Sequence, residues 1–107
     1  MNEQYFAIYD VKMKTPIGIR LGRMTVHKSF DKVNGCLDIL NHSEAFEGTI
    51  DNNGNCDIVG KIITLIKTIN YKASGKITSN GLDLFIINDR HHVFEIIGTP
   101  ISLVKEQ

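Results

Sequence analysis

The sequence lacks any excess of charge, because 12 lysines and arginines stand against 12 aspartates and glutamates in 107 residues. Without a net field to hold a phosphate backbone, we expect no nucleic-acid partner. No apolar run approaches the roughly 18 residues that suggest a membrane span, so we expect no membrane partner. Two prolines are present, and no low-complexity tract interrupts the chain. Residues 1–107 are therefore expected to form a single domain.

Cysteine is scarce, and the two that occur are Cys36 and Cys56. The first residues, Met1 to Gln4, lack the basic start and the apolar run of a secretory signal. We therefore expect a cytoplasmic protein in which both thiols stay reduced, buried and unreactive.

Motifs of enzymes and of metal sites are also missing. The sequence has no Cys-x-x-Cys or His-x-x-x-His pair for zinc, no glycine-rich phosphate loop and no Gly-x-Ser-x-Gly turn around a nucleophile. We expect neither a metal nor an organic cofactor. The lack of a catalytic motif favours a non-catalytic protein and leaves catalysis as an alternative hypothesis.

Residues branched at Cβ dominate what is present. The sequence has 16 isoleucines, 6 valines and 7 threonines against 3 alanines and 7 leucines, a balance typical of strands. Apolar or alternating segments between turn residues predict eight strands, near residues 5–13, 18–28, 34–41, 44–50, 55–64, 67–77, 81–88 and 91–98. We expect an all-β fold with little or no helix, an antiparallel up-and-down β-barrel of about eight strands. The helical spacing of apolar residues over 33–40 and over 59–69 leaves a helix in either segment as the alternative.

Glycines recur along the chain: Gly22, Gly35, Gly48 and Gly60 are 12 or 13 residues apart, and Gly75 and Gly98 follow. Glycine weakens a strand unless a bend or a close backbone approach requires it, and a small barrel needs such bends. The spacing therefore favours a closed barrel, with independent turn residues as the alternative explanation. The Asn34-Gly35 pair is itself typical of a hairpin turn.

Two short segments carry a resemblance to known proteins. Lys14-Thr15-Pro16-Ile17-Gly18 and Phe46-Glu47-Gly48-Thr49 resemble the K-T-P-x-G and F-E-G-T strand motifs of a group of short uncharacterised bacterial all-β proteins. The strand rhythm is more loosely similar to that of lipocalin-like and avidin-like barrels. The resemblance covers nearly the whole chain and implies a barrel fold. Because its motifs are turns and bends, it implies no functional residue.

A closed sheet of eight strands encloses a space that is either filled by side chains or holds one small ligand. The recurring glycines favour an open interior, so we expect non-covalent binding of a small organic molecule in the lumen. Tyrosine combines an apolar body with a hydroxyl, and arginine offers a fixed fork of donors to an anion. The candidate ligand-binding residues are Tyr5, Tyr9, Arg20, Tyr71, His92 and Glu95.

Two other functions are alternatives. The first is a protein-interaction module, a homodimer or the accessory of a partner enzyme, because apolar residues lie on strand faces that should be solvated. These residues are Phe85, Ile87, Ile96 and Ile97, which the C-terminal Ile101, Leu103 and Val104 could instead cover. The second is a small isomerase or lyase that uses His91 or His92 with a tyrosine.

Overall fold

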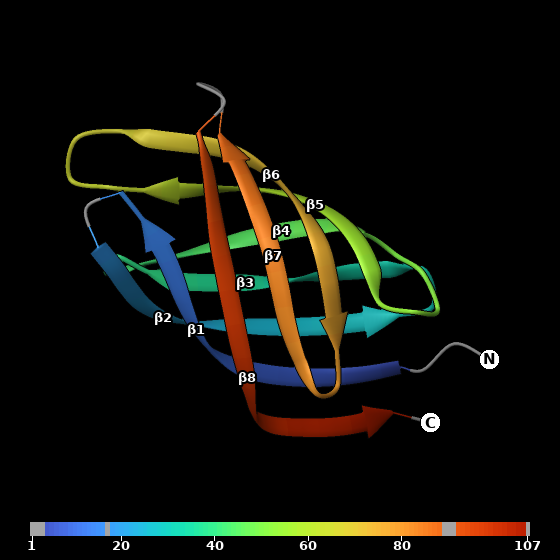
Figure 1. Cartoon of the computed structure of the whole chain (residues 1–107). Coiled ribbons are helices and arrows are strands. Elements are labelled where there is room, and N and C mark those ends of the chain that lie inside the picture. Colours follow the sequence, from blue (N-terminus) through green and yellow to red (C-terminus); the bar gives the residue numbers. More distant parts are fainter. Residues whose placement is uncertain (1–3, 17, 89–91, 107) are drawn as a thin grey trace.

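Eight antiparallel strands follow one another in the computed structural model, which describes residues 4–16, 18–88 and 92–106 (Figure 1). They are β1 (Gln4–Thr15), β2 (Gly18–Ser29), β3 (Lys32–Ile39), β4 (His42–Ile50), β5 (Asn55–Ile63), β6 (Thr68–Thr78), β7 (Gly81–Asn88) and β8 (Val93–Glu106). No helix occurs among the described residues. The predicted all-β, up-and-down topology is confirmed.

The sheet closes because β8 pairs with β1 as well as with β7, which Figure 1 shows as the red strand beside the blue one. Closure removes the free strand edges that an open sheet exposes. The last strand is longer than predicted, since β8 runs to Glu106 and not to residue 98. Ile101, Leu103 and Val104 are therefore part of the barrel wall and do not form a separate cover.

Alternation along the strands decides which side chains form the core. In β7, Leu82, Leu84 and Ile86 are buried while the residues between them are exposed. The same alternation in the other strands fills the barrel interior with apolar side chains. The largest fully buried ones are Tyr5, Tyr9, Met24, Leu37, Ile77, Leu84, Ile86 and Ile96.

Two glycines make room for aromatic rings inside the barrel. Gly35 on β3 pairs with Phe46 on β4, and Gly60 on β5 pairs with Tyr71 on β6. The Phe46 ring comes within 3.1 Å of where a Cβ on Gly35 would stand, and the Tyr71 hydroxyl lies 2.6 Å from the same position on Gly60. Each ring thus fills the space that a glycine leaves on the adjacent strand.

The turn predicted at Asn34-Gly35 is wrong. The chain reverses instead at Phe30 and Asp31, with a φ of 57° at Phe30, and Gly35 lies within β3. There β2 approaches so closely that a Cβ on Gly35 would overlap the carbonyl oxygen of Thr25. A close approach between strands, and not a turn, requires this glycine.

Two polar side chains also contribute to the interior. The Tyr9 hydroxyl donates a hydrogen bond of 2.6 Å to the Thr78 carbonyl oxygen, which joins β1 to the end of β6 across the barrel. Lys28 occupies an inward position of β2 and is 4% exposed.

Candidate functional site

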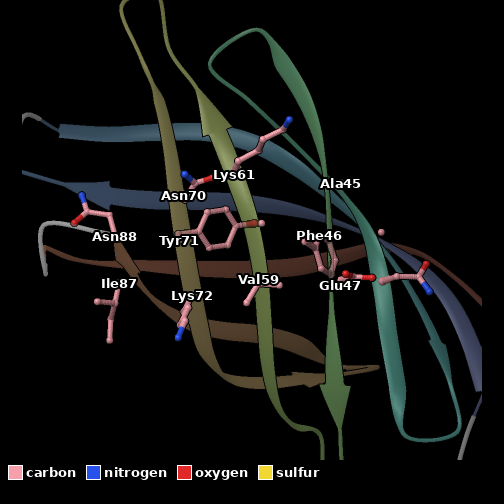
Figure 2. Close-up of a pocket in the computed structure, with 13 residues that line it drawn as sticks. Ala45, Phe46, Glu47, Val59, Lys61, Asn70, Tyr71, Lys72, Ile87 and Asn88 are labelled. Carbon is pink, nitrogen blue, oxygen red and sulfur yellow. The ribbon is translucent and has the colours of Figure 1, made fainter.

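A groove of about 1110 Å³ lies on the outer face of β3 to β7 (Figure 2). We call it the β3–β7 groove. Its volume slightly exceeds that of typical small-molecule sites, which are roughly 300 to 1,000 Å³. The strand register aligns one outward side chain from each of the five strands into a row across it: Asn34, Glu47, Val59, Lys72 and Ile87.

Glycine and aromatic residues form the floor of the groove. Gly35 and Gly60 contribute backbone without a side chain, and Phe46 and Tyr71 lie against them. Figure 2 shows the Tyr71 ring reaching from β6 toward β5. Burial raises the pKa of Tyr71 from 10.0 to about 12, so its hydroxyl remains protonated at neutral pH.

The charged residues that line the groove are two lysines, Lys61 and Lys72, and one carboxylate, Glu47. The two lysines differ in their surroundings. The Nζ of Lys61 lies 3.5 Å from Oε1 of Glu44. No carboxylate of the described residues lies within ion-pair distance of Lys72. Lys72 stands between Val59 and Ile87, which are 47% and 44% exposed. An ammonium group with apolar neighbours on both sides suits a ligand that joins an anionic group to an apolar body.

Comparisons of the chain with protein-family models, with curated proteins and with solved structures found no match. Within the described ranges, no three histidine, cysteine or acidic side chains gather as a metal site would require. The described part of the chain contains no helix long and apolar enough to cross a bilayer. The groove is therefore interpreted from its own geometry.

The three predicted tyrosines all turn inward, but one of them borders the groove. Tyr5 and Tyr9 are 2% and 0% exposed and belong to the core. Tyr71 is also buried, and it lines the groove from below. The structure thus separates Tyr71 from the other two, whose bulk serves packing.

Neither Arg20 nor His92 lines the groove, although His92 is hydrogen-bonded to Asn88, which does. Arg20 is half-buried on β2 and borders a different surface hollow that also contains Asp10 and Asp38. His92 is exposed before the start of β8, and its backbone N–H donates a 3.0 Å hydrogen bond to Oδ1 of Asn88. His91 lies outside the described residues.

Glu95 faces the outside of the barrel, which corrects its expected place in the lumen. Its Oε1 lies 3.4 Å from Nζ of Lys14 on β1. The neighbouring Ile96 is 1% exposed, so alternation along β8 directs Glu95 outward. The same alternation makes the prediction of a solvated Ile96 wrong, whereas Phe85, Ile87 and Ile97 are exposed as predicted.

Sequence reasoning missed the outward residues of the groove, above all Val59, Lys61 and Lys72. Each follows or precedes an inward residue, so alternation would have placed it on the outer face. Bringing the three together requires the register between β5 and β6, which aligns Val59 with Lys72.

The two cysteines are free, and their surroundings differ. Cys56 is buried, as predicted, whereas Cys36 is half-buried on β3. Burial first, and then the charges of Asp57 and Asp51, raise the pKa of Cys56 to about 12. Its thiol is therefore protonated, and unreactive, at neutral pH.

We expect iodoacetamide at pH 8 to label Cys36 at least about tenfold faster than Cys56 in the folded protein, because the thiolate is the reacting form. Mass spectrometry of the labelled protein, with Cys36→Ser and Cys56→Ser as single-thiol variants, measures the two rates. In urea the rates should become similar. Fast labelling of Cys56 under native conditions would contradict the burial of this residue.

Proposed function

We propose that the chain is a non-catalytic binding protein whose β-barrel holds a small organic anion in the β3–β7 groove. The observation that carries the proposal is the position of Lys72 between the exposed Val59 and Ile87 in a groove of about 1110 Å³. The expected class of function is kept, but the ligand lies on the outer face, because core side chains fill the described interior.

The groove offers separate partners for the two parts of such a ligand. An apolar body packs on Val59 and Ile87, where burial of apolar surface contributes roughly 25 cal/mol per Å². A carboxylate, sulfonate or phosphate pairs with Lys72, and the Asn70 amide supplies a further hydrogen bond. Because the groove is open to solvent, we expect affinities in the micromolar to millimolar range, about −8 to −4 kcal/mol.

Two fluorescent molecules test the proposal, since anilinonaphthalene sulfonate is an anion and N-phenyl-1-naphthylamine has a similar apolar body without the charge. We expect the sulfonate to bind with 1:1 stoichiometry. Lys72→Gln should weaken sulfonate binding about threefold to tenfold through loss of the ion pair and leave binding of the neutral compound unchanged. Val59→Asp should weaken the binding of both.

Lys76→Gln is the matched control, because Lys76 is an outward lysine of the same strand that does not line the groove. It should leave the affinity for the sulfonate unchanged. The proposal fails if Lys72→Gln and Lys76→Gln bind the sulfonate equally well, or if the unmodified chain binds neither compound.

A further inference from the structure

The outer face of β7, β8, β1 and β2 carries a row of four side chains in an unusual order. The register aligns them across the strands as apolar, acidic, basic and apolar: Phe85, Glu95, Lys14 and Ile19. Phe85 and Ile19 are 49% and 57% exposed, although both are large and apolar. Glu95 and Lys14 form an ion pair of 3.4 Å between them.

If this row faces a reversed copy of itself, each apolar residue meets an apolar residue and each acidic residue meets a basic one. A two-fold axis that runs parallel to the strands, between β8 and β1, reverses the row in a second copy. It lays Phe85 on Ile19 of the second copy and Glu95 on Lys14 of the second copy, and the same contacts recur on the other side of the axis. We propose that this outer face of β7, β8, β1 and β2, the dimer face, binds a second copy of this chain.

The adjacent row of the dimer face does not pair directly in this way. It consists of Asp83, Ile97, Lys12 and Leu21. Under the same axis, Lys12 lies opposite Ile97 of the second copy, and Leu21 lies opposite Asp83. Lys12 is offset sideways from Asp83 of the second copy by one strand spacing, about 5 Å, which a lysine side chain can bridge diagonally. Ile97 and the 70% exposed Leu21 meet in the same diagonal way. The first row therefore pairs acid with base and apolar with apolar directly across the interface, and the second row adds only diagonal contacts.

The β7 and β8 side of the dimer face carries two carboxylates, Asp83 and Glu95, and one lysine, Lys14, forms an ion pair with Glu95. Asp83 and Glu95 lie close together on the neighbouring strands β7 and β8, beside Lys14. Desolvation, and then the hydrogen bond and the charge of Glu95, raise the pKa of Asp83, while Lys14 lowers it. A second copy brings another Lys14 and another Lys12 to this pair. An apolar partner without such lysines would leave the two carboxylates without added counter-charge.

The face is also large enough for a stable dimer. The two longer extents of the molecule are 42 and 24 Å. A standard interface buries about 800 Å² of each partner, an area that one side of this barrel can supply. The ion pairs at the centre fix the register of the interface, and the apolar groups at its margins add contact area, which reverses the common arrangement of an apolar centre and a polar rim.

Sedimentation velocity of the full chain tests the proposal. We expect concentration-dependent dimers, and we expect Lys14→Glu and Glu95→Lys each to raise the dissociation constant of the dimer about tenfold or more, because each places like charges opposite one another. A mixture of the two variants should form a 1:1 heterodimer, because the two acidic residues at the centre of the Lys14→Glu row face the two basic residues at the centre of the Glu95→Lys row. The double variant Lys14→Glu/Glu95→Lys should again form a homodimer.

Lys67→Glu, a charge change in the exposed β5–β6 turn, is the control and should dimerise like the unmodified chain. Recovery of assembly on mixing shows that the single variants are folded. The proposal is overturned if the unmodified chain stays monomeric up to about 0.5 mM, where even a weak dimer is populated. It is equally overturned if the single variants dimerise normally or if their mixture does not assemble.

Discussion

Replacing Gly35 by alanine is expected to lower the free energy of unfolding by about 3 kcal/mol or more. The added methyl group would overlap the carbonyl oxygen of Thr25 and stand 3.1 Å from Cζ of Phe46. The Phe46 ring is able to shift, but the Thr25 carbonyl belongs to the backbone of β2. Relief therefore requires β2 and β3 to move apart and to lose hydrogen bonds of their ladder. Small domains have a total stability of about 5 to 15 kcal/mol, so the loss is a large share.

Gly81→Ala is the matched control for this substitution. A Cβ at Gly81 would have the carbonyl oxygen of Gly98 at 3.1 Å as its nearest neighbour, so a small adjustment suffices. We expect it to cost about 1 kcal/mol or less. Urea unfolding followed by far-ultraviolet circular dichroism measures both variants, because the chain has no tryptophan for fluorescence. Equal stability of the two variants would contradict the close approach of β2 to Gly35.

The sequence predicted the barrel because alternation encodes both the strand and its buried face. Leu82, Leu84 and Ile86 alternate with exposed residues in the chain and in the structure alike. The end of β8 was missed because proline normally interrupts a strand. Pro100 lies at the register shift opposite Tyr9, where the ladder is already irregular, and β8 continues beyond it.

The expectation of an open lumen failed for a reason that glycine spacing does not reveal. Gly35 and Gly60 leave space, but Phe46 and Tyr71 on the adjacent strands fill it. Whether a glycine opens a cavity depends on the residue across the ladder, and that pairing requires the register. The β3–β7 groove depends on register in the same way, so of the predicted site residues it includes Tyr71 alone.

The stability of the barrel is expected to fall steeply between pH 10 and about pH 12 because of Tyr71. Burial raises the pKa of its hydroxyl from 10.0 to about 12. The unfolded chain releases this proton near pH 10, whereas the folded chain retains it. The contribution to stability is therefore fully present below pH 10 and is lost as the pH rises to about 12. At about 1.36 kcal/mol for each tenfold difference in proton affinity, the complete loss, reached above pH 12, is roughly 3 kcal/mol.

Tyr71→Phe isolates this contribution, because phenylalanine keeps the ring and has no proton to release. Other groups that titrate above pH 10 affect both proteins alike, so the difference between their free energies of unfolding measures Tyr71. Urea unfolding at several pH values should show the unmodified chain losing roughly 2 kcal/mol more than the variant over this interval. Parallel curves for the two proteins would mean that the Tyr71 hydroxyl ionises as it does in water. That result would place it in open solvent and remove it from the floor of the groove.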